Sequence, residues 1–370
     1  MLNNRKIRPM KITAIDARVL RRLDWKFRWN EEIAPRYMDH LLVKISTDEG
    51  HEGICITYLM SPGEMESALP DLRSYLIGQD PHYVEAISYK LTNSLRNPGA
   101  VASTIDICLW DLLGKHHNEP IYRLLGAARK RIKAYASTYM YDTVPEYVEI
   151  AQQCYDLGYR AFKLHAFGVP DKDIEVCRAV HKVFGGKMDL MLDPVNAYDR
   201  LGAFKVGKVL EELDFYWYEA PIADSDLVGL ADLTRSFKIP ITAAESVTEG
   251  LRGYPKYLST NVVDSIRSIG DWIGGITAMR KSAALCEAFN AKYEPHSYGT
   301  TLIQAAHLHV MLSIHHCDLF EIPVPEGVFD IGMKDVIRVG KDGYVEAPTK
   351  PGLGYDVDWD KIEALTTKVL

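Results

Sequence analysis

The sequence lacks several features that would assign it to a specialised class of protein. Its six cysteines occur singly, without a CxxC pair, which favours reduced thiols in a cytoplasmic protein over disulfides or a zinc cluster. It has no basic excess, since 43 Lys and Arg residues against 50 Asp and Glu residues give a net charge of -7, and no basic stripe stands out. We therefore expect no nucleic-acid partner.

Long apolar runs are also missing. No uncharged apolar stretch reaches the length that spans a membrane, and residues 1–20 contain no apolar core of a secretory signal, so we expect a soluble protein without a membrane partner. The composition, with 47% hydrophobic and 25% charged residues, is that of an ordinary globular protein. A chain of 370 residues is too long for one simple core and fits a large barrel with an added domain.

Residues 1–130 are predicted to form an α+β segment. Strand-like alternation runs through "KITAIDARVL" at 11–20 and "HLLVKISTDEGHEGICITY" at 40–58, where DEG predicts a turn between two strands. Residues 64–126 instead have apolar residues at spacings of three and four, which is typical of amphipathic helices, and the last helical stretch is expected to end at Gly126.

Residues 131–340 have a different pattern, in which short apolar strands alternate with amphipathic helical segments. The expected strands are IKAYAS, AFKLHAF, DLMLDPV, FYWYEAP, ITAAES, DSIRSIG, AKYEPHS and DLFEIP. Eight strands separated by helices indicate an α/β fold, a parallel (β/α) barrel of the TIM type, whose chemistry is expected where the strands end. After residue 325 the pattern breaks into turns, and residues 341–370, with "PTKPGLG", form a C-terminal segment.

Charged side chains stand at the ends of the expected strands. KLH places Lys163 and His165 two residues apart, and therefore on one face of a short apolar strand. Burying an unpaired ammonium is costly, so the pair is either a strand end that reaches water or part of a functional site. The other strand-end residues are Asp193, Glu219, Glu245, His296 and Glu321.

Asp193, Glu219 and Glu245 follow one another at intervals of 26 residues, about the length of one βα unit. Such intervals also arise by chance in a chain with 50 acidic residues, so the inference depends on their position at the ends of three successive strands. Three carboxylates at one barrel mouth would repel one another, and an all-oxygen ligand set suits Mg²⁺. The alternative is that unrelated acids cap strand ends and face water.

This order of residues resembles the enolase superfamily and, within it, the mandelate racemase/muconate lactonizing enzyme family. The resemblance lies in Lys-x-His on the second barrel strand, Asp, Glu and Glu ending strands three to five, His on the seventh strand and Glu on the eighth. GGIT at 274–277, after the sixth strand, is a further match. The resemblance covers nearly the whole chain, and it implies a modified (β/α)7β barrel at 131–340 with a capping domain at 1–130, completed by the C-terminal segment at 341–370.

The resemblance implies an enzyme that uses Mg²⁺, abstracts the proton α to a carboxylate and stabilises the resulting enediolate. Asp193, Glu219 and Glu245 would hold the Mg²⁺. The catalytic residues that it implies are Lys163 near the substrate carboxylate, His165 as the base on one face, His296 as acid or base on the opposite face, and Glu321 as a hydrogen-bonding group.

The chain departs from the family pattern at three positions. The second base position, often Lys, is His165, and Asn196 follows the first metal ligand by three residues instead of two. The Asp that usually orients the seventh-strand His lies five residues before GG, where this chain has Ile269. Asp271 continues the 26-residue spacing and could substitute for it, so its role is left open. Without such a partner, His296 would be less basic and a better proton donor.

The loop "RRLDWKFRWNEE" at 21–32 corresponds to the family's loop that closes over the site. Basic residues are interleaved with Trp25 and Trp29, and we predict that Trp25 and Arg28 bind a polar, anionic substrate such as an acid sugar. The alternative is a solvated loop with two aromatic anchors on the cap.

The favoured reaction is β-elimination (dehydration) of an acid sugar, because a His without its Asp suits proton donation to a departing hydroxyl. Cycloisomerisation and racemisation or epimerisation are the alternatives within the superfamily. A non-catalytic metal-binding regulatory protein is the rival from another class, against which bases on two faces argue. We further expect a small-molecule carboxylate as the substrate and a homo-oligomer.

The HLH motif at 307–309 resembles the zinc pair of metal-dependent hydrolases. It lies in a helical stretch in the last third of the chain, whereas those hydrolases need it at the end of the first barrel strand. We therefore predict packing or surface roles for His307 and His309.

Overall fold

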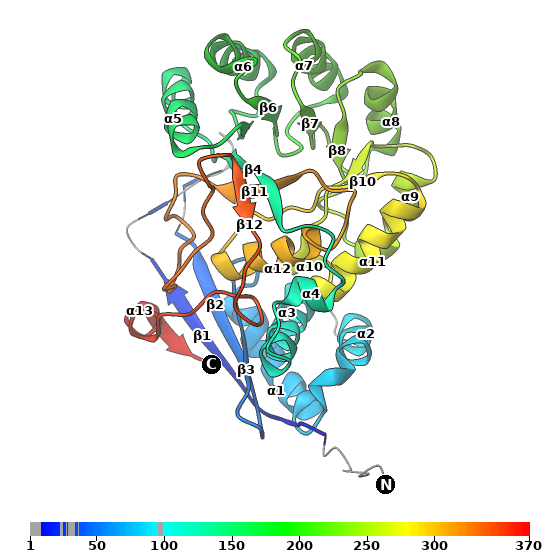
Figure 1. Cartoon of the computed structure of the whole chain (residues 1–370). Helices are drawn as coiled ribbons and strands as arrows, with labels where there is room; N and C mark the ends of the chain where they lie inside the picture. Colours follow the sequence, from blue (N-terminus) through cyan, green and yellow to red (C-terminus); the bar gives the residue numbers. More distant parts are fainter. Residues whose placement is uncertain (1–8, 23–24, 27, 29–33, 36, 95–98) are drawn as a thin grey trace.

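A four-stranded antiparallel sheet forms the base of the cap (Figure 1). The structure is a computed structural model that describes residues 9–22, 25–26, 28, 34–35, 37–94 and 99–370. The sheet has the order β13-β1-β2-β3, with β1 (Ile12–Arg21), β2 (Asp39–Thr47), β3 (Glu52–Thr57) and β13 (Thr366–Val369). Because β13 pairs with β1, the C-terminal strand lies beside the first strand of the cap.

The N-terminal part also contains helices, and α1 and α3 pack against this sheet. The helices are α1 (Pro62–Leu76), η1 (Pro81–Tyr83), α2 (Val84–Ser94), α3 (Gly99–His116) and α4 (Ile121–Leu124). The longest of them, α3, is buried from Ala100 to Gly114 because it packs against β2 and β3 and also against α10 (Gly270–Ile273) and α11 (Gly275–Ala288). It is therefore the main link between the cap and the barrel.

The GGIT motif at 274–277 makes this link. Asp106 in α3 accepts hydrogen bonds from the backbone N–H of Thr277 (3.0 Å) and from Ser88 Oγ (2.5 Å). Gly275 has φ +73°, and a Cβ at this position would lie 2.4 Å from Asp106 Oδ1, so only glycine lets the helix approach so closely. The motif thus fits a packing role between α11 and α3.

A curled parallel sheet forms the barrel, in the order β10-β9-β8-β7-β6-β5-β4-β11. Its strands are β4 (Arg131–Ser137), β5 (Ala161–Leu164), β6 (Asp189–Leu192), β7 (Trp217–Glu219), β8 (Ile241–Ala243), β9 (Ser265–Ile266), β10 (Lys292–Tyr293) and β11 (Leu319–Pro323). Seven of them lie within a strand expected from the sequence, β4 begins one residue before the expected IKAYAS, and the predicted fold class is confirmed. An additional strand, β12 (Tyr344–Glu346), pairs antiparallel with β4.

The connecting helices lie outside the strands, as Figure 1 shows for α5 to α8. They are α5 (Val144–Leu157), α6 (Pro170–Phe184), α7 (Arg200–Glu212), α8 (Leu227–Ser236), α9 (Pro255–Leu258) and α12 (Thr301–Met311), with η2 (Gly250–Arg252) before α9 and α13 (Trp359–Leu365) near the C-terminus. Local sequence sets their starts: Thr143 and Glu146 form a capping box at α5, and Asp199 accepts a hydrogen bond from Gly202 at α7.

Side chains join β10 to β11, between which no backbone ladder is present in the described residues. The buried Glu294 carboxylate accepts hydrogen bonds from the backbone N–H groups of Asp318 (2.7 Å) and Leu319 (3.3 Å). Ser297 Oγ donates to the Glu321 carbonyl (3.0 Å) and accepts from the Glu321 N–H (3.1 Å). These contacts hold together β10 and β11, the two end strands in this order.

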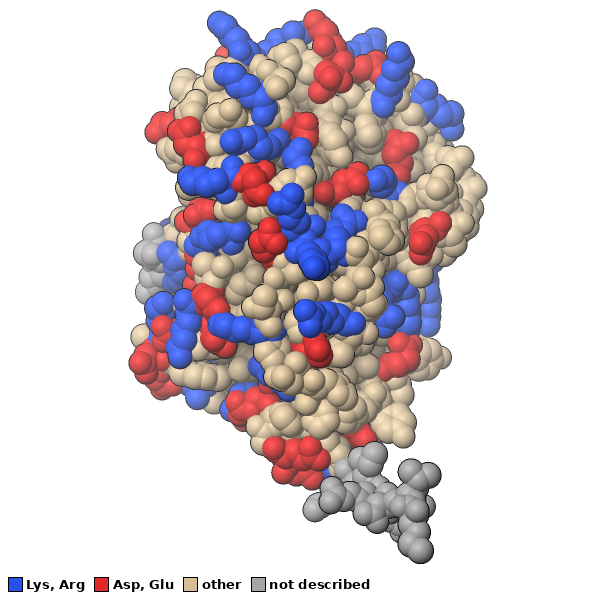
Figure 2. Space-filling model, viewed as in Figure 1, with Lys and Arg blue, Asp and Glu red and all other residues tan. Residues whose placement is uncertain are grey.

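The surface carries both signs of charge, and on the face in Figure 2 acidic and basic side chains are interspersed. All six cysteines are buried and free, which confirms the prediction of unpaired thiols. None of the helices in the described part of the chain combines the length and apolarity that crossing a membrane requires. The division into segments 1–130, 131–340 and 341–370 stays a prediction.

Candidate active site

Direct contacts connect the strand-end residues predicted from the sequence into one group. Lys163 lies in β5, Glu219 ends β7 and Glu321 lies in β11. The others follow β5, β6, β8 and β10 within three residues: His165, Asp193, Glu245 and His296. Parallel strands place their carboxyl ends at one edge of a sheet, which explains why residues so far apart in sequence meet here.

Asp193, Glu219 and Glu245 form a cluster of carboxylates. Each offers one oxygen, and these oxygens lie within 4.8 Å of one another. Backbone N–H of Val195 donates to Asp193 Oδ1 (2.8 Å), and Trp217 Nε1 donates to Glu219 Oε2 (3.0 Å), which orients two of the three groups. The all-oxygen donor set suits a hard divalent cation such as Mg²⁺.

The pKa values in this cluster indicate negative charge that is not fully balanced. Burial raises the pKa of Glu219 to about 7, and burial together with Asp193 raises the pKa of Glu245 well above its usual range. Burial also opposes ionisation of Asp193, but Lys163 and His165 outweigh it and hold the Asp193 pKa below its usual range. No described lysine or arginine lies within ion-pair distance of Glu245, which faces His296 instead. A divalent cation would supply the missing charge, so the residues fit a metal.

Lys163 is fully buried among three carboxylates. Its Nζ lies 3.1 Å from Asp193 Oδ2, 2.7 Å from Glu219 Oε1 and 2.9 Å from Glu321 Oε1. Burial lowers the pKa of Lys163, yet the carboxylates outweigh that effect and the pKa lies above its usual range. Lys163 is therefore a cation in this arrangement, suited to holding a negative charge rather than to removing a proton.

Arg267 is a second buried cation of the site, and it was not among the residues predicted from the sequence. Its Nε lies 2.6 Å from Glu219 Oε1, its Nη2 pairs with Glu321, and its Nη1 donates to the Glu294 carbonyl (3.1 Å). The side chain is 1% exposed. An arginine inside the apolar strand DSIRSIG was a usable signal, because a buried guanidinium needs carboxylate partners.

His165 bridges the backbone after β4 and the carboxylate cluster. Its Nδ1 lies 2.5 Å from the Thr138 carbonyl oxygen, and its Nε2 lies 3.0 Å from Asp193 Oδ2. The Thr138 carbonyl oxygen can only accept, so Nδ1 donates to it and Nε2 is the nitrogen that faces the carboxylate cluster.

His296 lies beside a different carboxylate of the cluster, that of Glu245. Its Nε2 lies 3.4 Å from Glu245 Oε1, and its Nδ1 is buried without a hydrogen-bond partner among the described residues. Burial lowers the pKa of His296 to about 3, and the positive charges of Arg267 and Lys163 add to this effect. The sequence-based expectation of a weakly basic His296 agrees with this direction.

Asp271 does not orient His296, so the role left open by its spacing is not filled. Both carboxylate oxygens of Asp271 are buried and have no hydrogen-bond partner in the described part of the chain. The residue that pairs with His296 through the backbone is Ile269, whereas Asp271 lies two positions further on, in the helical turn α10. Burial raises the pKa of Asp271 to about 7.

Two of the carboxylate residues, Glu219 and Glu245, each have a neighbour with an unusual backbone conformation. Ala220, directly after Glu219, has φ +38°, and Ala244, directly before Glu245, has φ +72°, both in the left-handed region that non-glycine residues rarely adopt. The Asp224 carboxylate accepts hydrogen bonds from the N–H groups of Ala244 (2.8 Å) and Ser246 (2.6 Å). Asp224 therefore clamps the backbone on both sides of Glu245, a role that no sequence spacing indicated.

Aromatic rings connect the predicted cap residue Trp25 to the site. Trp25 contacts Tyr139 (ring centroids 5.6 Å apart) and Phe329 (6.0 Å), and Phe329 contacts Tyr298 (5.1 Å). The Tyr298 ring in turn lies 6.3 Å from His165 and 6.2 Å from the seventh-strand histidine. This packing fits a cap loop that borders the site.

Arg28, the other predicted substrate residue, pairs with Asp142 at 2.6 Å. The Asp142 side chain is 77% exposed, so this pair lies at the surface. Trp29, the second tryptophan of the loop, lies outside the described residues.

His307 and His309 are structural, as predicted. His307 Nε2 accepts a hydrogen bond from the Gly270 N–H (3.0 Å), and His309 Nδ1 accepts one from the Tyr122 N–H (3.0 Å). Both side chains are fully buried in α12. They stabilise packing and are not part of the carboxylate cluster.

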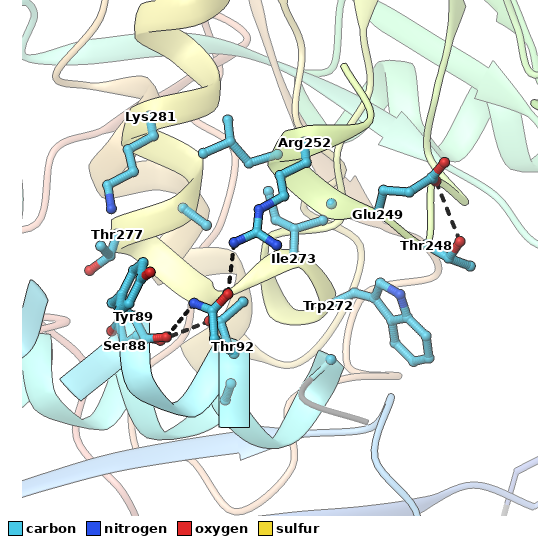
Figure 3. Close-up of a pocket in the computed structure, with 17 residues that line it drawn as sticks. Ser88, Tyr89, Thr92, Thr248, Glu249, Arg252, Trp272, Ile273, Thr277 and Lys281 are labelled. Atoms are coloured by element: carbon cyan, nitrogen blue, oxygen red, sulfur yellow. Dashed lines mark hydrogen bonds between the residues drawn. The ribbon is translucent and has the colours of Figure 1, made fainter. Parts of the chain in front are cut away.

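A separate pocket of about 700 Å³ lies between the cap and the barrel (Figure 3). Its walls come from α2 and α3 on one side and from η2, α10 and α11 on the other. Arg252 crosses it to donate to Asn93 Oδ1 (2.7 Å). None of the predicted site residues lines this pocket, so we assign it no catalytic role.

Two family descriptions match this chain. The family description "Enolase C-terminal domain-like" matches residues 146–361, and "Mandelate racemase / muconate lactonizing enzyme, N-terminal domain" matches residues 36–126.

Three similar proteins are named enzymes. D-galactarolactone cycloisomerase of Agrobacterium fabrum is 30% identical, over 95% of this chain and 98% of that protein. Arabinonate dehydratase of Saccharolobus solfataricus is 25% identical, over 88% of this chain and 90% of that protein. The crystal structure of D-glucarate dehydratase from Agrobacterium tumefaciens, complexed with magnesium, superposes with a TM-score of 0.86 at 26% identity, over 98% of this chain and 100% of that one.

Proposed function

Because the chain belongs to the mandelate racemase/muconate lactonizing enzyme family of the enolase superfamily, we propose that it is a Mg²⁺-dependent dehydratase of an acid sugar. One observation carries the proposal: two histidines flank the carboxylate cluster, His165 against Asp193 (3.0 Å) and His296 against Glu245 (3.4 Å). A protein that only binds a metal has no need of two such groups.

Asp193, Glu219 and Glu245 would hold Mg²⁺, whose charge offsets that of the substrate carboxylate and makes the adjacent C–H more acidic. Lys163 is a buried ammonium beside two of these residues and would hold a carboxylate oxygen of the substrate. Its pKa, raised by the surrounding carboxylates against the effect of burial, keeps it positive for this role.

His165 would take the α-proton of the substrate at Nε2, while Nδ1–H stays bonded to the Thr138 carbonyl and fixes the orientation of the ring. His296 would give a proton to the β-hydroxyl, which then leaves as water. The resulting enol becomes a 2-keto acid, and Glu321, held by Arg267 and Lys163, would complete the hydrogen bonding around the carboxylate.

Cycloisomerisation is the second candidate, and the 30% identical D-galactarolactone cycloisomerase favours it. It begins with the same proton abstraction, but the group that leaves the β-carbon is a ring oxygen instead of a hydroxyl. Racemisation or epimerisation ranks third, because it would need His296 to return a proton to carbon. The rival from another class, a non-catalytic metal-binding protein, is not supported, because the relatives named above are enzymes. Small acid-sugar carboxylates as substrates, a homo-oligomer and a cytoplasmic location belong to the same proposal.

A screen of aldonic and aldaric acids and their lactones with Mg²⁺, read out as 2-keto acid formation, tests the proposal. In D₂O, His296→Asn should still exchange the α-proton but form no keto acid, whereas His165→Asn should do neither. The reverse pattern would exchange the two roles. A wild type that incorporates deuterium into an unchanged carbon skeleton, without keto acid or ring opening, would be a racemase or epimerase.

The metal assignment has its own test. Glu219→Gln, Asp193→Asn and Glu245→Gln should each weaken Mg²⁺ binding in calorimetric titration, because each removes one carboxylate charge from the cluster. Unchanged Mg²⁺ affinity in all three variants would refute the assignment.

A further inference from the structure

Four of the twelve histidines of the chain gather on the cap, away from the carboxylate cluster. His51 directly precedes β3, His82 lies in η1, His116 is the last residue of α3, and His117 follows it. The centroid of the His116 ring lies 5.1 Å from that of His82, 4.9 Å from that of His117 and 5.0 Å from that of His51. Three separate segments of the chain thus bring imidazoles together around His116.

Three of these rings are arranged as metal ligands could be. His82, His116 and His117 each offer a ring nitrogen, and the three nitrogens lie within 4.8 Å of one another. Around a tetrahedral ion with Zn–N bonds of about 2.0–2.1 Å, ligand nitrogens are about 3.3 Å apart, so closure needs side-chain shifts of about 1 Å. His82 and His117 are exposed, and their side chains have room for such a shift.

Asp80 prepares His82 for this role. Its Oδ1 lies 2.7 Å from His82 Nδ1 and also accepts a hydrogen bond from the His82 backbone N–H (2.9 Å). When Nδ1–H donates to this carboxylate, the ring hydrogen stays on Nδ1 and the Nε2 lone pair is available to a metal. Metal-binding histidines commonly have this carboxylate support, which fixes the tautomer and raises the basicity of the ligand.

His116 provides a second sign of an incomplete site. Its Nδ1 is buried and lacks a hydrogen-bond partner among the described residues, and the nearest carboxylate oxygen, Oε2 of Glu49, is 3.8 Å away. Buried polar atoms are rarely left unsatisfied, because a buried atom without a hydrogen bond destabilises the fold. Glu49, His51 and His116 form an adjacent ligand-like group, so His116 lies at the centre of both sets.

We propose that His82, His116 and His117 bind a divalent transition-metal ion, with Zn²⁺ as the physiological candidate and Asp80 as the residue that orients His82. Imidazole ligands suit Zn²⁺, Cu²⁺ and Ni²⁺ and disfavour Mg²⁺, so this site and the carboxylate cluster select different ions. The bound ion would tie η1 to the end of α3, the helix that joins the cap to the barrel. The proposal does not depend on the proposed reaction.

Calorimetric titration of the untagged full-length protein with Zn²⁺ in excess Mg²⁺ tests this site. We expect a Zn²⁺ site that is retained in Glu245→Gln and in His315→Ala, an exposed histidine outside the cluster. His116→Ala and the double variant His82→Ala/His117→Ala should lose it. Asp80→Asn should weaken it by about 10–100-fold, as loss of such a supporting carboxylate does.

The opposite patterns would overturn the proposal. One is a wild type that binds no Zn²⁺, and another is Zn²⁺ binding that survives in His116→Ala but disappears in Glu245→Gln, which would place the ion at the barrel mouth. Because His82 and His117 are exposed, the double variant should fold, and circular dichroism with thermal melting checks this. Loss of Zn²⁺ binding in a folded double variant supports the site even where His116→Ala disturbs α3.

Discussion

Arg267 Nε lies 2.6 Å from Glu219 Oε1, and both side chains are at most 1% exposed. A carboxylate proposed to hold a metal thus also forms an ion pair with a buried guanidinium. The same arginine reaches Glu321 and the Glu294 carbonyl, and it therefore connects the middle of the barrel to the side chains that join β10 to β11. We infer that Arg267 stabilises the arrangement of the acidic residues rather than contacting the substrate.

Arg267→Met should lower the free energy of unfolding by about 3–5 kcal/mol, because it leaves buried carboxylates without their partner. Urea denaturation measures the change. The matched control is Arg178→Met, which removes an exposed pair with Glu212 (3.0 Å, side chains 48% and 62% exposed) and should cost at most about 1 kcal/mol. Equal losses in the two variants would contradict a structural role for the buried pair.

Asp224→Asn should weaken Mg²⁺ binding by about 10–100-fold with little change in secondary structure, because the clamp around Glu245 loses an acceptor oxygen. Isothermal titration with Mg²⁺ measures the effect. Asp232→Asn, a substitution of the same type in α8 at a residue that pairs with Arg235, serves as the control. If Asp224→Asn binds Mg²⁺ like the wild type, the clamp does not position the ligand.

Asp271 should make stability depend on pH. Its pKa is raised from 3.8 to about 7 by burial, so the folded state holds a proton that the unfolded state releases above about pH 4. Stability should therefore fall as the pH rises from about 4 through 7, by at most about 4 kcal/mol for a shift of about three units.

Asp271→Asn removes this titration and should flatten the stability profile between pH 4.5 and 8, as measured by urea denaturation at each pH. Its kcat should follow the wild-type dependence on pH, because Asp271 makes no hydrogen bond to His296. A selective loss of kcat in a stable Asp271→Asn would instead restore the orienting role that the spacing left open.

Trp25→Ala should raise KM by about tenfold while changing Tm little. The variant loses the contacts of Trp25 with Tyr139 and Phe329, each worth roughly 0.5–1.5 kcal/mol. Phe329 in turn contacts Tyr298 beside the site. Steady-state kinetics on the substrate found in the screen, together with thermal melts, decide the matter. Trp359→Ala in α13, where the tryptophan is 42% exposed, is the control and should leave KM unchanged. Equal KM values for Trp25→Ala and the wild type would place the loop outside the site.

The sequence by itself determined the fold class and the family, both of which are confirmed. The reason is that eight short apolar strands alternate with helices, and in a parallel barrel the strand ends share one edge. Lys163, Asp193 and Glu219 could therefore be expected near one another before any distance was known. Their roles as metal ligands and catalytic groups stay predictions.

Only the tertiary structure decided which groups touch. Arg267 and Glu219 are 48 residues apart, and nothing in their spacing shows that the guanidinium points inward. Asp224 clamps the backbone beside Glu245 because a loop after β7 folds against the end of β8. Asp271 continued the spacing of the strand-end acids but lies in a helical turn, where its carboxylate makes no hydrogen bond to His296. Sequence periodicity locates the ends of strands, whereas side-chain contacts depend on packing across strands that are remote in the chain.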